Sequence, residues 1–253
     1  MTSNQEKLIS QDDFISSCIQ EMSKAEVYLP FTISSRLKRE AIEKLEIIKG
    51  EILKAKYDAI NREEEKLANL MLALQCGVNS FISELNCILS LKEGIFRRAW
   101  DFLVDAQEYT VWSYRAAPYN KMLLSRYEDL LLLEKAYFPK MVYLSMGATV
   151  SNGKCSICGS LIDECDHLEG LPYMGRICQI VDYNVVNVNH IAMVDEPRDK
   201  RCILLSFSDE KKENMIDRFT KEPIGKIKPE DRLKQGLLTE GIMLRFAETL
   251  EIF

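Results

Sequence analysis

A cluster of cysteine and histidine in residues 155–178 is the feature of this sequence that most restricts the fold. The segment reads CSICGSLIDECDHLEGLPYMGRIC, and it holds four of the eight cysteines and one of the two histidines among the 253 residues. A short loop with this composition can be organised by disulfides, by a metal ion or by a reactive thiol pair. Because each requires a different arrangement of side chains, their spacing indicates which applies.

Cys155 and Cys158 have the spacing of a metal-binding turn, in which two thiolates reach one ion and the glycine that follows relieves the turn. Cys165 and His167 are two positions apart, so on an extended segment both side chains point the same way and can complete a tetrahedron. These four residues are the preferred ligand set. Cys178 is a fifth candidate, which could replace Cys165 or His167.

One structural zinc ion is the predicted cofactor, because mixtures of cysteine and histidine suit Zn²⁺ and need no redox partner. A CxxC oxidoreductase, which needs the pair at the start of a helix, and a set of buried thiols without metal are the alternatives. Protein ligands suffice to fill every position on the metal, so we predict no catalytic residue. Glu164, Asp166 and Glu169 lie among the ligands and could act as a base, but we expect hydrogen-bonded or solvated loop carboxylates.

Residues 1–138 are predicted to form a helical bundle or coiled-coil-like domain. Helices are expected over residues 10–28, 34–90, 92–115 and 120–138, from apolar residues at steps of three and four. The second stretch is either one helix or two with a bend near Arg62 or Gly77. Unbroken, it would be a rod of about 85 Å that packs along other helices, its own or a partner's.

Several side chains of this half are expected in its core. The aromatic residues between 92 and 115 recur at helical spacing, which is typical of core packing. Cys18, Cys76 and Cys87 lie within helical patterns without ligand spacing, so we expect them to be core thiols.

Residues 139–253 are predicted to form a zinc-binding α+β domain, because β-branched residues and period-two patterns begin after Pro139. Strands are expected over residues 140–150, 177–188, 189–196 and 201–207, with Cys202 buried in the last, and helices over 209–220 and 229–248. The predicted fold class is therefore α+β: a long-helix bundle or hairpin, followed by a small zinc-stabilised β-rich module with C-terminal helices.

Charge and composition limit the class of partner and the location. The net charge of −6 lacks the basic excess of a protein held to phosphates by charge, so nucleic-acid binding is possible but not favoured. No apolar run of about 18 residues and no secretory signal is evident, so we predict a cytoplasmic protein without membrane contact.

Residues 155–205 resemble a zinc-binding segment of bacterial and phage-derived proteins, distantly like the C-terminal part of phage prohead proteases. The resemblance is carried by CSICG, CDHLEGLPYMGRIC and VNHIAMVDEP. It implies a serine nucleophile at the position of Ala192, which has no hydroxyl, and His190 alone cannot supply one. The resemblance therefore implies a shared module and a phage, mobile-element or anti-phage defence setting, without an inherited activity.

The predicted function is a non-catalytic adaptor or assembly subunit. It would hold protein partners, or a second copy of itself, through the N-terminal helices and the zinc module. The alternatives are a nucleic-acid-binding zinc protein, and a zinc-dependent hydrolase or divergent prohead-protease-like enzyme.

Overall fold

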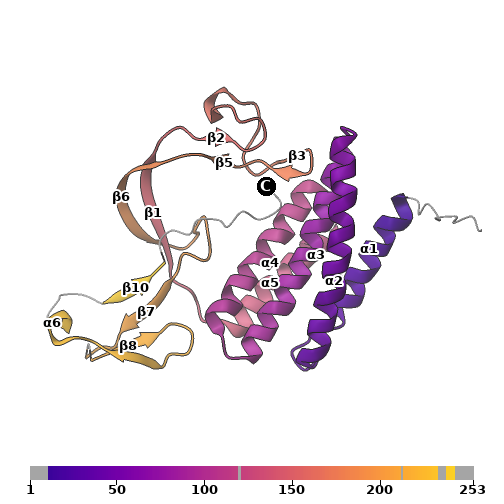
Figure 1. The fold of residues 1–253 in the computed structure, drawn as a ribbon. Helices are drawn as coiled ribbons and strands as arrows, with labels where there is room; N and C mark the ends of the chain where they lie inside the picture. Colours follow the sequence, from indigo (N-terminus) through magenta and orange to yellow (C-terminus); the bar gives the residue numbers. More distant parts are fainter. Residues whose placement is uncertain (1–10, 119–120, 212, 233–237, 243–253) are drawn as a thin grey trace, which may run out of the picture.

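The computed structural model describes residues 11–118, 121–211, 213–232 and 238–242. Its fold is α+β, as predicted: a helical bundle stands beside a set of small antiparallel sheets (Figure 1). The bundle consists of α1 (Gln11–Glu26), α2 (Ser35–Asn61), α3 (Glu65–Lys92), α4 (Phe96–Ala116) and α5 (Lys121–Tyr137). Residue 10, where the first helix was predicted to begin, lies outside the described residues.

The long apolar stripe forms two antiparallel helices, α2 and α3, and not one rod. The chain turns back at Arg62, one of the two predicted positions, and Glu63 adopts a positive φ of 56° in this connection. Lys56 reaches across the hairpin to Gln75, with 2.6 Å between Nζ and Oε1. α3 then continues through Gly77 without a break.

α3 is the central helix of the bundle. By length and composition it could cross a membrane, which the sequence analysis did not anticipate, but 89% of its apolar window is buried inside the protein. Such burial is typical of the core helix of a soluble protein. Cys76 and Cys87 on α3 and Cys18 on α1 are buried, so the prediction of core thiols is confirmed.

Trp100 and Tyr109 of α4 are buried in the core, as predicted, and Phe96, Phe102 and Trp112 pack against it partly buried. Trp100 is fully buried and meets Phe138 edge-on, with ring centroids 5.3 Å apart. Tyr109 meets Trp112 in the same manner at 5.8 Å. Phe138 follows α5 directly, and Tyr143 of the first strand lies 6.5 Å from Trp100, so this cluster joins the bundle to the β-rich half.

The described part of the C-terminal half contains four small sheets. β1 (Tyr143–Val150) pairs with β6 (Val185–Val194), β2 (Lys154–Cys155) with β5 (Ile180–Val181), and β3 (Pro172–Tyr173) with β4 (Arg176–Ile177). The fourth sheet has the order β10 (Thr239–Gly241), β7 (Leu204–Ser208), β8 (Asn214–Asp217), β9 (Pro223–Lys226). β1 and β6 form an arch between the fourth sheet and the cysteine-rich loop, which returns to the helices (Figure 1).

The helix predicted over residues 209–220 is wrong. The carboxylate of Asp209 accepts hydrogen bonds from the backbone N–H groups of Glu213 and Asn214, so it closes a turn and does not begin a helix. β8 follows and pairs with β7 on one side and β9 on the other. The pairing of three strands therefore outweighs the local pattern.

The helix predicted over residues 229–248 is confirmed at its first four residues and is wrong over the described residues 238–242. α6 is a single turn, Pro229–Arg232, and residues 239–241 form strand β10 against β7. Residues 233–237 and 243–248 lie outside the described part of the chain. The strands predicted over 177–188 and 189–196 are divided differently, because β6 continues through residues 188 and 189 as one strand.

A cluster of charged side chains around the buried Arg201 fixes the turn before β7 to α4. Arg201 donates to both carboxylate oxygens of Glu108, at 3.0 and 2.9 Å, and also to Asp105. Trp100 donates from Nε1 to the backbone oxygen of Lys200 at 3.0 Å. This cluster was not predicted from the sequence.

Candidate metal centre

The first two candidate ligands lie at a turn that begins on β2. Cys155 pairs with Ile180 of β5, and its backbone oxygen accepts a 2.8 Å hydrogen bond from the N–H of Gly159. Gly159 has a φ of +76°, a conformation that glycine adopts without the strain of a side chain. The turn brings Cys158 back toward Cys155, as the spacing predicted.

The second pair lies on the following extended segment. Cys165 has φ −122° and ψ 134°, and its Sγ lies 3.2 Å from Nδ1 of His167. The ring of His167 stands perpendicular to that of Tyr173, with 4.6 Å between centroids. The hydroxyl of Tyr173 accepts a hydrogen bond from the backbone N–H of Leu168 at 3.0 Å. This bond holds the Tyr173 ring against the imidazole of His167.

The structure brings the four preferred ligands together. One ligand atom each from Cys155, Cys158, Cys165 and His167 lies within 4.8 Å of all the others, and the Sγ atoms of Cys158 and Cys165 are 3.4 Å apart. Ligand atoms about 2.3 Å from a tetrahedral zinc are about 3.8 Å from one another. The cluster therefore has the donors and the dimensions to hold a metal ion.

Cys178, the fifth candidate, lies at the buried side of this group. Its Sγ is 3.7 Å from that of Cys155, and its side chain is fully buried. Its backbone is held by hydrogen bonds with Gly170 and Leu171. Cys178 therefore adjoins the cluster through Cys155.

The crowded thiols differ in acidity. Burial opposes ionisation of Cys155, but backbone N–H groups of the turn and the neighbouring thiols lower its pKa to about 7. Hydrogen bonds, above all from backbone, also lower the pKa of Cys158. A backbone N–H favours the thiolate of Cys165, but burial and the adjacent thiols raise its pKa to about 11; burial and Cys155 raise that of Cys178 to about 12. Adjacent thiolates repel one another, and a bound cation would remove that penalty.

The loop of the candidate ligands, residues 155–178, is docked on the bundle. Ile177 of β4 packs with Leu72, Cys76 and Tyr109 of the helices. Arg115 of α4 donates from Nη1 to the backbone oxygen of Gly170 at 3.1 Å. The loop that carries the candidate ligands is thus part of the same packed structure as α3 and α4.

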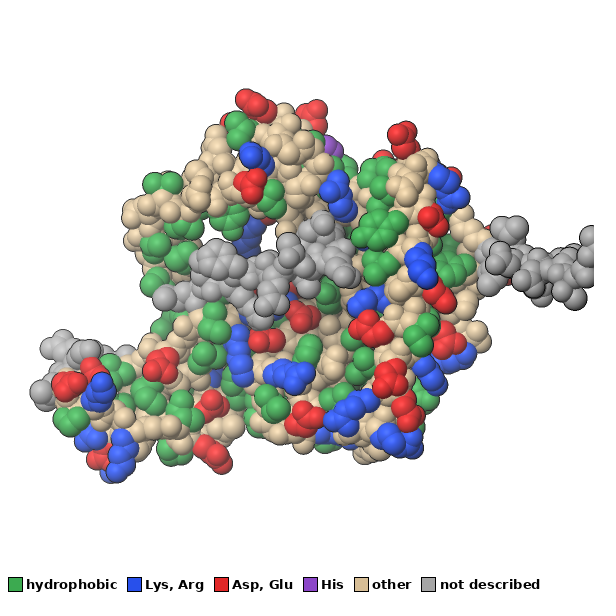
Figure 2. Space-filling model, viewed as in Figure 1, with side chains coloured by type: hydrophobic (Ala, Val, Ile, Leu, Met, Phe, Trp, Pro, Cys, Tyr) green, Lys and Arg blue, Asp and Glu red, His purple; other side chains and the backbone are tan. Residues whose placement is uncertain are grey.

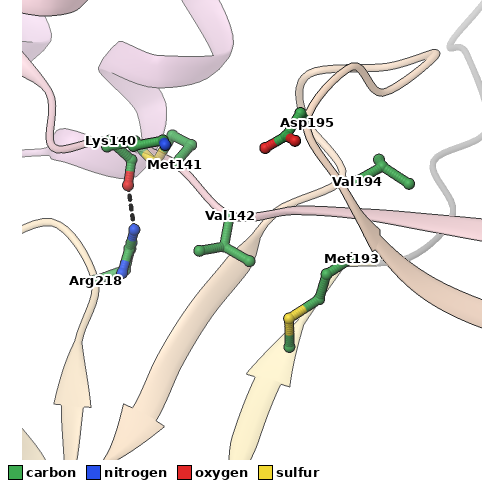
Figure 3. A pocket seen from close by; sticks show the side chains of 7 residues that line it. All are labelled: Lys140, Met141, Val142, Met193, Val194, Asp195 and Arg218. Atoms are coloured by element: carbon green, nitrogen blue, oxygen red, sulfur yellow. Dashed lines mark hydrogen bonds between the residues drawn. The ribbon is translucent and has the colours of Figure 1, made fainter.

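The surroundings bear on the alternatives considered for the cysteine pair. Residues 156–158 form a turn after β2. In a CxxC oxidoreductase the cysteine pair lies at the start of an α-helix, which is not the arrangement here. Glu164, Asp166 and Glu169 are exposed, as predicted, and Glu169 pairs with Arg198. A separate open hollow of about 320 Å³ is lined by Met141, Met193, Arg218 and their neighbours (Figure 3), and none of the candidate ligands lines it.

The second histidine lies away from the ligand group. His190 is exposed in the middle of β6 opposite Gly147, where a Cβ atom would come within 2.2 Å of its ring. Glycine is therefore needed for the ring to lie across the neighbouring strand. Ala192 is paired with Ser145 on the same ribbon, and Cys202 is buried just before β7.

No protein-family model, curated protein or solved structure matches this chain. The resemblance to a phage-related zinc segment therefore stays a prediction.

Proposed function

We propose that the protein is a non-catalytic adaptor or assembly subunit whose β-rich half is held together by one structural zinc ion. The convergence of Cys155, Cys158, Cys165 and His167 within 4.8 Å carries this proposal. Three thiolates and one imidazole satisfy a tetrahedral zinc without a water molecule, and such fully protein-ligated sites are structural.

The position of the site supports a scaffolding role. Its loop contributes Ile177 to the core cluster of α3 and α4 and receives Arg115 from the bundle. A zinc ion at the cluster would fix the loop in the shape that the helices contact. Its binding energy would therefore contribute to the folding of this half of the protein.

Partner proteins or a second copy of the chain would bind at exposed surface of the helices. α3 is buried along most of its length, so the partner surface proposed for the helical half must lie elsewhere, and α2 offers Ile47 and Tyr57, whose exposed fractions are 66% and 57%. Large exposed apolar side chains are typical of protein-binding surfaces when they gather. The phage or defence setting implied by the resemblance is part of this proposal.

Elemental analysis and coordination spectroscopy of the purified protein test the role of zinc. We expect one zinc per chain with three sulfur ligands and one nitrogen ligand, and its loss in Cys158→Ser and Cys165→Ser. Cys18→Ala, a buried cysteine on α1, is the matched control and should keep the metal. Absence of zinc would overturn the structural site, and a coordinated water would favour the hydrolase.

The adaptor role needs a separate test. Proteins cross-linked to the native chain in its own cells should be lost with Ile47→Asp or Tyr57→Asp while zinc content is unchanged. Retention of all cross-links in both variants would remove α2 as the partner surface.

A further inference from the structure

The β1–β6 ribbon is a second unusual feature of the molecule. β1 and β6 form a two-stranded sheet, and within the described residues no third strand pairs along either edge beyond the bridge of Tyr143 with Ile203 at its root. A two-stranded sheet alone is marginally stable in water unless one face is covered. Figure 2 shows hydrophobic side chains gathered along this arch.

The register places apolar residues on one face of the ribbon. Directly opposed residues of an antiparallel pair share a face. One face, called the apolar face from here on, consists of the pairs Leu144–Met193, Met146–Ile191, Ala148–Val188 and Val150–Val185. The intervening pairs on the other face are Ser145–Ala192, Gly147–His190 and Thr149–Asn187.

Two bulges maintain this separation. The register shifts between Gly147 and Ala148, and again between Thr149 and Val150, so that Asn189 and Val186 of β6 are left without an opposite residue. Without each extra residue, the rest of β6 would be turned to the other face. The irregularities therefore keep eight apolar side chains together.

The apolar face is exposed in the described structure. Ile191 and Met193 have exposed fractions of 53% and 65%, and Val150, Val185 and Val188 have fractions between 41% and 49%. Leu144, Met146 and Ala148 are partly buried, and among the described residues β10 covers the root of the ribbon: a Cβ atom on Gly241 would lie 2.5 Å from Cδ1 of Leu144. In Figure 3 the side chain of Met193 points from β6 toward this strand.

The chain leaves the described structure beside this face. Ile242 donates a 2.9 Å hydrogen bond to the backbone oxygen of Ile203, next to the start of β1. Residues 243–253 follow, with the sequence MLRFAETLEIF, in which six of eleven residues are Met, Leu, Ile or Phe. At about 3.3 Å per residue these eleven residues can extend about 36 Å, and the ribbon of eight paired positions is about 27 Å long.

The size of the apolar face favours a segment of this chain over a second copy. A ribbon about 27 Å long and about 10 Å wide presents on the order of 270 Å². A stable complex of two proteins buries about 800 Å² on each partner. A tethered segment forms its contact within one molecule and needs no comparable area, because its effective concentration is high.

We propose that the apolar face is a docking surface for a short apolar peptide segment, and that residues 243–253 of the same chain are its occupant. This inference does not depend on the zinc site or on the partner surface of α2. It assigns a role to the bulges of β6 and to the composition of residues 243–253 together.

Limited trypsin digestion of the full-length chain tests the proposal, because Arg245 lies within residues 243–253. Val188→Glu places a charge on the apolar face, and the adjacent Asn187→Glu places the same charge on the opposite face. We expect cleavage after Arg245 to accelerate about tenfold or more in Val188→Glu, since proteolysis follows the population of the open form. Asn187→Glu should be cleaved at the wild-type rate, and equal rates in both variants would overturn the proposal.

A chain truncated after Ile242 provides the second measurement. A synthetic peptide of residues 243–253 should bind this chain and slow hydrogen exchange of the β6 amides, and it should fail to do so with Val188→Glu. The proposal would be contradicted if the peptide bound the Val188→Glu chain as tightly as the unsubstituted one. It would also be contradicted if truncation left the hydrogen-exchange rates of the β6 amides unchanged. A full-length chain that is dimeric, with β6 protected only in the dimer, would assign the face to a second copy instead.

Discussion

The side-chain Oδ1 of Asn69 on α3 accepts a 2.8 Å hydrogen bond from the backbone N–H of Gly175, at the tip of the β3–β4 hairpin. Gly175 and Met174 both have positive φ, as a two-residue hairpin turn requires. A side chain at Gly175 would press on Lys56 of α2, with 3.2 Å between Cβ and Cδ. This contact connects the loop of the candidate ligands to the helices.

Asn69→Ala should weaken the attachment of the candidate-ligand loop, residues 155–178, to the helical bundle. The backbone N–H of Gly175 would lose its partner, which costs about 1–2 kcal/mol of unfolding free energy in the zinc-loaded protein. After chelation the loss should be smaller, because the loop is no longer held against α3. Urea unfolding with and without chelator measures both values.

Asn86→Ala is the control for this substitution, since Asn86 lies on the same helix and the change in helix propensity is the same. Equal losses in Asn69→Ala with and without zinc would mean that the hairpin docks independently of the metal.

Removal of zinc should loosen the cysteine-rich loop and leave the bundle folded. The bundle has its own core around Leu45, Ile52, Met71 and Leu85, and these contacts do not involve the candidate ligands. Hydrogen exchange by mass spectrometry should therefore show faster exchange in residues 155–178 after chelation, with α2 and α3 unchanged. Loss of protection throughout α3 would show that the two halves unfold together.

The helices and the ligand cluster could be predicted because their determinants are local. Helical spacing places the buried side of a helix within a few residues, and the four ligands lie between Cys155 and His167. The turn at Asp209 could not be recognised, because an aspartate that accepts backbone N–H groups begins helices and turns alike. Arg201 was missed because Asp105 and Glu108 are more than 90 residues away along the chain.

The assignment of residues to the two faces of the β1–β6 ribbon could not be predicted from the sequence either. Alternation in β6 is interrupted at Asn189 and Val186, and only the pairing with β1 shows that these residues are bulged. A period-two pattern with two extra residues no longer identifies one face.

Cys178→Ser should retain the metal, because we expect Cys178 to support Cys155 from the buried side without binding the ion. In the cobalt-substituted protein, the sulfur-to-cobalt absorption should be unchanged by Cys178→Ser. Cys165→Ser should abolish it, since the site loses one of its three thiolate ligands and with it the metal. A decrease in Cys178→Ser together with no change in His167→Ala would instead place Cys178 on the metal and His167 beside it.

Arg201→Met should destabilise the protein far more than Arg198→Met, although both arginines form ion pairs. Arg201 is 8% exposed and holds Glu108 and Asp105 of α4, whose side chains are 31% and 30% exposed, so its removal leaves two partly buried carboxylates without their counter-charge. The expected loss of unfolding free energy is about 2–3 kcal/mol, below that of a fully buried pair because water reaches these carboxylates. The side chain of Arg198 is 85% exposed in its pair with Glu169, and such surface pairs contribute about 0–1 kcal/mol. Urea unfolding of the two variants measures the difference, and similar losses would show that the Arg201 cluster does not hold the β-rich half to α4.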